Sequence, residues 1–312
     1  MRSSLSIKHL LGLDGVSEND IRVILDTAVE FRKLLDRPVK KVPSLRGLTI
    51  VNLFFENSTR TRTSFELAEK RLSADIVNFA SSNSSVQKGE TLLDTLRNIE
   101  AMKIDVVVVR HKGTGVPKFL ADHSGAIVLN AGDGAHEHPT QALLDMFTIE
   151  QKLGSLKGKR VAIVGDIRHS RVARSDAWGL TTMGASVTFC GPSTLLPRYR
   201  EDFPAVTWET DVKKSVAGAD AVIALRLQKE RMEDSLLPSL REYRNYFGVT
   251  EEVLEMASPT ALIMHPGPIN RGVELDSEVA DGEHSVILEQ VTNGVAVRMS
   301  ALYLLSGGRA NG

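Results

Sequence analysis

The chain of 312 residues has few of the features that mark a secreted or membrane protein. Cys190 is its only cysteine, so we expect neither an intrachain disulfide nor a cysteine-based metal site. No apolar run approaches the roughly 20 residues that cross a bilayer, and the first 13 residues lack the apolar core of a signal peptide. Together these absences predict a cytoplasmic protein in a reducing environment.

Neither a charge of one sign nor aromatic residues are plentiful. The chain has 38 Lys and Arg against 39 Asp and Glu, a formal net charge of −1, and only 5% aromatic residues. A nearly neutral chain has no overall field that would attract nucleic acid or a membrane surface, so we expect neither as a partner. Any strong positive field must therefore be local.

Short apolar runs alternate with amphipathic stretches along the chain, and no internal repeat is present. Runs such as Val106–Val109 are apolar without alternation, which is typical of strands that helices cover on both faces of a parallel sheet. Two series of strands are expected, at 48–55, 75–79, 105–109 and 126–129, and then at 160–165, 186–190, 220–225 and 261–264. Because 312 residues exceed what one core usually organises, the pattern predicts an α/β protein with two domains, each a parallel sheet flanked by helices.

Three helices help to place the domain boundary. Ser17 is expected to cap a helix over 17–37, with Asp20 three residues later as in a capping box. Further helices are expected over 139–153 and 285–306. We place the boundary near Gly154–Gly158, which gives a first domain at 1–150 and a second at 151–284. The last helix either completes the second domain or, as we expect, packs back onto the first.

The segment 54–63 combines features that suit a phosphate group. It follows an apolar strand and opens an amphipathic helix, whose N-terminus presents N–H groups and a partial positive charge. Ser58, Thr59 and Thr61 add hydroxyl donors, and Arg60 adds a planar fork that matches phosphate oxygens. A capped surface helix with solvated arginines would show the same pattern. The glycine-rich run of a nucleotide-type phosphate loop is absent.

A second segment, Ala131–Gln141, also leads from a strand into a helix. Pro139 suits the first helical turn, so His138 and Gln141 can point into a cleft at the carboxyl ends of the strands. His136, Glu137 and His138 resemble metal ligands in kind. Their spacing does not place two ligands on one helical face and no third ligand is evident, so we expect no metal. A lone histidine is more often structural than functional.

Arginines recur directly after the predicted strands. Arg110 ends one strand, Arg171 follows a second, and Arg226 and Gln228 follow a third. Each arginine alone would usually be a surface charge, but ligands of open α/β sheets bind at this edge. Together with Arg60, the recurring cations predict a small polyanionic substrate.

Four runs occur in a fixed order along the chain. They are Ser-Thr-Arg-Thr-Arg at 58–62, His-Pro-Thr-Gln at 138–141, Arg-Leu-Gln-Lys-Glu-Arg at 226–231 and His-Pro-Gly-Pro at 265–268. Over nearly the whole chain they resemble the motifs of the aspartate/ornithine carbamoyltransferase superfamily, and within it the catalytic chains of the aspartate carbamoyltransferases. The last two runs distinguish the aspartate enzymes, because ornithine enzymes typically carry Ser-Met-Gly and His-Cys-Leu-Pro segments. One departure is Gly267, where some relatives have leucine, and it bears on the packing around the carbamoyl group.

The resemblance implies an activity and an assembly. One domain would bind carbamoyl phosphate and the other L-aspartate, and the carbamoyl group would pass to the aspartate amine, as in pyrimidine biosynthesis, without a cofactor. The resemblance also implies a homotrimer, in which the loop 81–90 brings Ser84 and Lys88 to a neighbouring subunit's site. Taken alone, that sequence favours a flexible polar loop. A regulatory chain or a dihydroorotase as a further partner stays open.

The resemblance also implies roles for single residues. The phosphate would be held by Ser58, Thr59, Arg60, Thr61 and Arg110, and the carbonyl oxygen would be stabilised by Thr61, Arg110 and His138. The carbamoyl amide would be oriented by Gln141 and by the backbone of Gly267 and Pro268. The aspartate carboxylates would be bound by Lys88, Arg171, Arg226 and Gln228. On domain closure Glu56 would pair with Arg171 and Arg231.

Three other functions stay open. A carbamoyltransferase for another amine such as ornithine is opposed by Arg171 and Arg226, because they would face a cationic side chain. An oxidoreductase with a dinucleotide-binding fold is opposed by the run at 161–165, which has only one of the three glycines of that fingerprint. A non-catalytic relative would have damaged phosphate residues, whereas Arg60, Arg110 and His138 are in place.

Overall fold

The computed structural model describes residues 5–80, 90–228, 236 and 239–307. By their internal contacts the residues form two compact units: unit 1 is Met1–Leu143 with Thr292–Gly312, and unit 2 is Leu144–Val291. The chain passes from one to the other within α5 (Pro139–Leu153) and α11 (Ile287–Leu305), so both helices contribute to both units. The domain limits predicted from the sequence remain a prediction.

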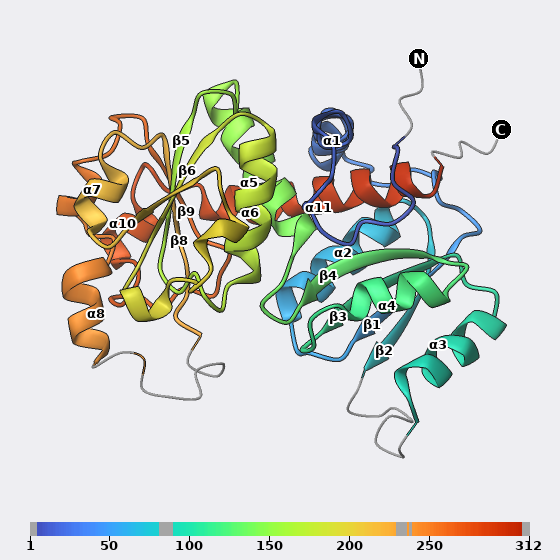
Figure 1. Cartoon of the computed structure of the whole chain (residues 1–312). Helices are drawn as coiled ribbons and strands as arrows, with labels where there is room; N and C mark the ends of the chain where they lie inside the picture. The colour runs from blue at the N-terminus through green and yellow to red at the C-terminus, as the bar shows by residue number, and fades with distance from the viewer. Residues whose placement is uncertain (1–4, 81–89, 229–235, 237–238, 308–312) are drawn as a thin grey trace. The chain divides into compact units, whose positions relative to one another are not determined.

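The sheet of unit 1 has four parallel strands in the order β2-β1-β3-β4 (Figure 1). The strands are β1 (Thr49–Phe54), β2 (Asp75–Ala80), β3 (Val106–His111) and β4 (Ile127–Asp133). All four match predicted strands, although β3 and β4 run further toward their carboxyl ends than expected. Because β2 and β3 lie on opposite sides of β1, the strand order reverses between β1 and β3, where open α/β sheets form a ligand-binding crevice.

Helices cover both faces of the unit 1 sheet. α3 (Leu92–Ala101) and α4 (Val116–His123) bury Leu96 and Leu120 on one face, in a cluster that includes Val51 and Val107 of the strands. α2 (Thr59–Arg71) packs on the other face, where its Glu69 accepts a hydrogen bond from Asn52 of β1. This double cover explains why the interior strands are apolar without alternation.

The first helix, α1 (Glu18–Leu35), begins where the sequence predicts. Ser17 is its N-cap, and the Ser17 side chain accepts a hydrogen bond from the Asp20 N–H at 3.1 Å. In a capping box the third residue's side chain would in turn accept from the N-cap N–H, and here other contacts replace that hydrogen bond. The Asp20 carboxylate accepts from the Ser17 hydroxyl at 2.9 Å and from the Ser6 N–H at 2.8 Å, so it fastens the N-terminal segment to the helix.

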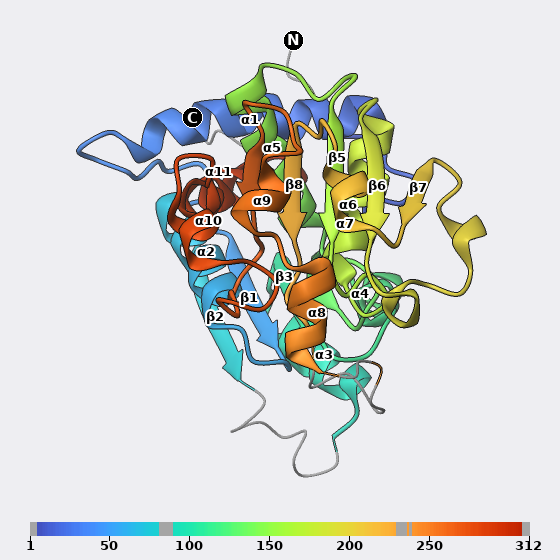
Figure 2. The same ribbon diagram turned by 90° about the vertical axis from the view of Figure 1, so that its left-hand side faces the viewer.

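The sheet of unit 2 has five parallel strands in the order β7-β6-β5-β8-β9, of which Figure 2 labels β7, β6, β5 and β8. They are β5 (Arg160–Val164), β6 (Ser186–Cys190), β7 (Val206–Glu209), β8 (Ala221–Ala224) and β9 (Leu262–Met264). Four of them match predicted strands, and β7 was missed. The strand order reverses between β5 and β8. Both sheets therefore confirm the predicted fold class.

Helices also flank the unit 2 sheet. They are α6 (Arg171–Thr182), α7 (Val212–Val216), α8 (Leu240–Phe247), α9 (Glu251–Leu254) and α10 (Ser277–Asp281). Residues of α7, α9 and α10 share a buried cluster with Ala162 and Val164 of β5 and with Val222 of β8. Among the described residues no helix is long and apolar enough to cross a membrane.

Candidate functional site

The predicted phosphate segment, Ser58–Thr61, lies just beyond the reversal point of the unit 1 sheet. β1 ends at Phe54 and α2 begins at Thr59, with Ser58 as its N-cap. The Ser58 side chain makes no capping hydrogen bond, and the first turn of α2 contains no acidic residue. A helix start of this kind suits an anion, because the first-turn N–H groups and the helix dipole both favour negative charge.

Arg110 is brought to the same edge by the register of the sheet. It pairs with Phe54, and alternate residues of a strand face the same side, so Arg110 lies on the face of β3 that α2 covers. Its Nη1 donates to the Ala131 carbonyl at 3.1 Å, and its Nη2 lies 3.2 Å from the Glu56 carboxylate. Arg110 is therefore a buried cation held beside the start of α2.

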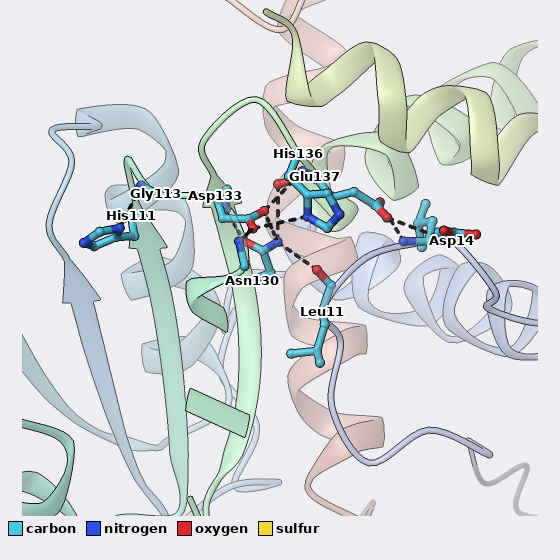
Figure 3. Close-up of polar contacts among 11 residues, drawn as sticks. Leu11, Asp14, His111, Gly113, Asn130, Asp133, His136 and Glu137 are labelled. Atoms are coloured by element: carbon cyan, nitrogen blue, oxygen red, sulfur yellow. Dashed lines mark hydrogen bonds and ion pairs between the residues drawn. The ribbon is translucent and has the colours of Figure 1, made fainter. Parts of the chain in front are cut away.

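His138 and Gln141 also belong to unit 1. His138 directly precedes α5 and its carbonyl accepts from the Gln141 N–H at 2.9 Å, so the two residues share the first turn. Both are nearly buried. The loop before them is closed by the Asp133 N–H, which donates to the Glu137 carbonyl at 3.1 Å (Figure 3).

The side chains that resembled metal ligands have other contacts. His136 Nδ1 lies 3.2 Å from the Asp133 carboxylate, and the Glu137 carboxylate accepts from backbone N–H groups of Leu13 and Asp14 (Figure 3). In the described part of the chain no group of three or more His, Cys, Asp or Glu is arranged to hold a metal ion.

The cations of unit 2 gather at the reversal point of its own sheet. Arg171 is the first residue of α6, whose N-cap Ser170 accepts from the Ala173 N–H at 3.1 Å. Arg226 follows β8, and Gln228 Nε2 donates to the His169 carbonyl at 3.1 Å. This bond fastens the loop after β8 to the loop after β5. Three of the four residues predicted for aspartate therefore share one edge of the sheet.

The His-Pro-Gly-Pro run follows β9. The His265 N–H donates to Gln290 Oε1 at 3.0 Å, and His265 Nδ1 accepts from the Gly267 N–H at 2.7 Å. The Gly267–Pro268 peptide bond is cis, and Gly267 has a φ of +69°, a conformation that glycine adopts without strain. The departure from leucine at this position fits that backbone.

A buried polar network holds the His-Pro-Gly-Pro run in place. Gln290 Nε2 donates to Asp145 Oδ1 at 2.6 Å, and His265 Nε2 lies 3.3 Å from Glu274. Burial and the neighbouring Asp145 carboxylate hold the pKa of Asp176 well above its usual range. The sequence did not reveal this network, because its members lie on separate elements and form no motif.

Three predicted site residues, Ser84, Lys88 and Arg231, lie outside the described residues. Glu56 contacts Arg110 within unit 1, and its predicted pairing with Arg171 and Arg231 stays a prediction.

Comparisons with known proteins cover both units. Residues 8–151 match the carbamoyl-phosphate binding domain of the aspartate/ornithine carbamoyltransferases, and residues 157–305 match their Asp/Orn binding domain. The chain is 61% identical over 302 residues to the aspartate carbamoyltransferase catalytic subunit of Gemmatimonas aurantiaca, covering 97% of this chain and 94% of the relative.

Two solved structures show the same fold. The ornithine carbamoyltransferase of Pyrococcus furiosus has a TM-score of 0.87 and 29% identity, covering 98% of this chain and 99% of its own. The aspartate transcarbamoylase of Trypanosoma cruzi, solved with carbamoyl phosphate and aspartate, has a TM-score of 0.86 and 29% identity, covering 95% of both chains. With both domains matched in order along nearly its whole length, the chain belongs to the aspartate/ornithine carbamoyltransferase family.

Proposed function

We propose that this chain is an enzyme that transfers the carbamoyl group of carbamoyl phosphate to the amino group of L-aspartate. The products are N-carbamoyl-L-aspartate, a pyrimidine precursor, and phosphate. The observation that carries this proposal is the high identity, over nearly the whole chain, to a relative described as an aspartate carbamoyltransferase catalytic subunit. The fold alone does not decide between acceptors, because an ornithine enzyme shares it. The runs at 226–231 and 265–268 favour aspartate.

The reaction needs positioning and electrostatic stabilisation rather than a covalent intermediate. The unprotonated aspartate amine attacks the carbonyl carbon of carbamoyl phosphate and a C–N bond forms. The bond from carbon to the phosphate oxygen breaks, and the proton that the amine loses passes to the departing phosphate. Negative charge builds on the carbonyl oxygen and then leaves with the phosphate. Donors that are fixed before the reaction stabilise that charge without reorganising.

Carbamoyl phosphate would bind to unit 1. The phosphate would lie against Ser58, Thr59, Arg60, Thr61 and Arg110, and the carbonyl oxygen would lie against Thr61, Arg110 and His138. Supporting this are the helix start beside the reversal point of the sheet and the buried guanidinium of Arg110 next to it. Gln141 and the backbone of Gly267 and Pro268 would orient the carbamoyl amide.

Aspartate would bind through cations of unit 2. Arg171 would take the α-carboxylate, and Arg226 with Gln228 would take the side-chain carboxylate, with Lys88 completing the site. The hydrogen bond from Gln228 to the His169 carbonyl supports this assignment, because it holds the loop of Arg226 beside that of Arg171.

The family resemblance supports a cytoplasmic homotrimer in which Ser84 and Lys88 serve the site of a neighbouring subunit. Glu56 would pair with Arg171 and Arg231 when the domains close. A regulatory chain or a dihydroorotase as a further partner of such a trimer stays open.

The experiment that tests the function offers carbamoyl phosphate with aspartate or with ornithine to the full chain in parallel. Mass spectrometry of the products should detect N-carbamoyl-L-aspartate and little or no citrulline. Phosphate should appear in equal amount to the carbamoylated amino acid. Citrulline as the main product would replace this function with its ornithine counterpart.

A further inference from the structure

The Glu137 carboxylate lies deep in unit 1 and binds a distant part of the chain. It is 2% exposed, and its two oxygens accept hydrogen bonds from the Leu13 N–H at 2.7 Å and the Asp14 N–H at 3.2 Å (Figure 3). Buried carboxylates are costly unless such bonds are made, so this contact fixes both partners. Leu13 and Asp14 stand just ahead of α1.

The backbone of the N-terminal segment makes room for this carboxylate. A Cβ atom at Gly12 would collide with the side chain of Glu137. Glycine therefore permits the close approach through which Glu137 reaches the next two N–H groups.

The main chain of Glu137 is fixed as well. Its N–H donates to Asp133 Oδ1 at 3.1 Å, and its carbonyl accepts from the Asp133 N–H at 3.1 Å and from Asn130 Nδ2 at 3.3 Å. Asn130 Nδ2 also donates to the Leu11 carbonyl at 2.8 Å, so a second side chain joins the same segment to the same loop. The residue that follows directly is His138, whose Cα position is thereby set.

Arg110 is bound to the strand that leads into this loop, since its Nη1 donates to the Ala131 carbonyl of β4. The Gly132 N–H next to it donates to Asn130 Oδ1 at 2.7 Å. Arg110 is thus held by β4 itself, whereas His138 ends the loop 134–138, which Glu137 ties to Leu13 and Asp14.

We propose that Glu137 is a positioning residue, which fastens Leu13 and Asp14 to the loop 134–138 and so sets the place of His138 in the site. This inference rests on the role proposed above for His138 in carbamoyl transfer. The phosphate contacts lie on α2 and β3, and Arg110 is held by β4 rather than by this loop. Loss of the Glu137 contact therefore lowers kcat and leaves phosphate binding nearly unchanged.

Glu137→Gln is the primary test. The amide is nearly isosteric but has one acceptor oxygen, so one of the two N–H groups loses its acceptor and faces a donor. We expect kcat to fall at least about tenfold, as for a displaced transition-state donor, while the inhibition constant of inorganic phosphate changes less than about twofold. Gly12→Ala places a methyl group against the Glu137 carboxylate and displaces it. This variant should likewise lower kcat and leave the inhibition constant of phosphate nearly unchanged.

Asp20→Asn is the matched control. Asp20 is also a buried carboxylate that accepts a backbone N–H of the N-terminal segment, from Ser6, but its other hydrogen bonds go to the hydroxyls of Ser6 and Ser17 rather than to the loop 134–138. Its replacement should lower the Tm and leave kcat unchanged at temperatures where the protein is folded.

A double-mutant cycle separates positioning from general loss of structure. If Glu137 acts through His138, Glu137→Gln should change kcat little in a His138→Ala background. A wild-type kcat in Glu137→Gln, or the same fold loss in both backgrounds, would overturn the inference. If His138→Ala itself keeps the wild-type kcat, the inference falls with the role of His138, whereas the products of the wild-type chain still decide the proposed function.

Discussion

Among single residues, Glu69 of α2 illustrates the cost of a buried carboxyl group. The side chain has no exposed surface, and burial raises its pKa to about 7, although a hydrogen bond from Asn52 opposes the shift. The folded-state pKa lies above the unfolded value of 4.5. The stabilising contribution of the protonated group is therefore fully present below pH 4.5 and is lost as the pH rises to about 7. The loss is on the order of 3 kcal/mol.

Glu69→Gln should remove this dependence on pH. Glutamine keeps an oxygen that accepts from Asn52 but cannot ionise, so the variant should have a higher Tm than the wild type at pH 8. At pH 4.5 the difference between the two Tm values should nearly vanish. Thermal unfolding followed by circular dichroism across this range gives the measurement.

The control for replacing a carboxylate by an amide on the same helix is Glu66→Gln, since the Glu66 side chain is only partly buried and pairs with Arg62. A gain for Glu69→Gln that is equal at pH 4.5 and pH 8 would show that ionisation of Glu69 is not its cause.

Individual residues differ in how well the sequence predicts their place. The positions of Arg110 near the end of a strand and of Arg226 just after one followed from the apolar runs before them, and β3 and β8 confirm both. Arg171 instead begins α6, after the loop that follows β5. The contacts of Glu137 could not be foreseen, because its partners Leu13 and Asp14 lie more than a hundred residues earlier. The neighbouring His136 and His138 instead raised the question of a metal site.

At the scale of elements, the start of α2 makes the most direct prediction. Arg60→Ala should lower kcat on the order of a hundredfold or more, because a bidentate donor to the leaving phosphate is lost. Arg60 is exposed, so the fold should survive. Steady-state kinetics with saturating aspartate give the measurement.

The matched control for Arg60 is Arg62→Ala on the same helix turn. Arg62 is also exposed and pairs with Glu66 at 3.1 Å, so its loss should change kcat little. Equal effects of the two substitutions would assign the loss of activity to the charge of the helix start rather than to a contact of Arg60.

Most of the predicted strands read as short apolar runs, which β7 lacks. Interior strands such as β3 are covered on both faces and read as continuous apolar runs. β7 is a four-residue strand at the edge of the unit 2 sheet, where only Val206 is buried. Its four residues are too few to establish either the alternation typical of a half-buried strand or the 3.6-residue period of a helix. Only its pairing with β6 defines it as a strand.

The loop after β8 makes a prediction about the choice of substrate. Arg226→Ala should weaken aspartate binding far more than carbamoyl phosphate binding, because it removes the cation that faces the side-chain carboxylate. A bisubstrate analogue that joins a phosphonate to aspartate should bind the wild type on the order of a thousandfold more tightly than its ornithine counterpart, since like charges in a closed site cost several kcal/mol.

Calorimetric titration of both analogues against the wild type and Arg226→Ala gives the comparison, with carbamoyl phosphate as the internal control. If the two analogues bind the wild type equally well, Arg226 does not select the acceptor, and the assignment of aspartate to this loop fails.

At the scale of the whole molecule, the two units have the same kind of sheet and the same placement of cations. Each has a parallel sheet whose strand order reverses once, between β1 and β3 in unit 1 and between β5 and β8 in unit 2. In each, arginines lie at the carboxyl ends of the strands at the reversal point or on the segments that follow them. Two anionic reactants and two such edges fit a reaction in which each unit presents one reactant, as proposed here.

The shared sites proposed for the trimer lead to a complementation test. A site would need Arg60 of its own subunit and Lys88 of a neighbour, so Lys88→Ala and Arg60→Ala trimers are each inactive for different reasons. After equal mixing, dissociation and random reassembly, about one site in four should have both side chains intact. Activity should therefore return to about a quarter of the wild-type value.

Arg60→Ala mixed with His138→Ala is the control for this test, because both residues would belong to the same subunit's share of the site. No combination of those two chains restores an intact site, so their hybrids should stay inactive. Native mass spectrometry would verify that hybrids have formed in both mixtures. Hybrids of Lys88→Ala and Arg60→Ala that remain inactive would place Lys88 in the site of its own subunit or in none. Recovery confined to the Lys88 mixture requires that Lys88 act across a subunit boundary, since no rearrangement within one chain can separate two defects of the same site.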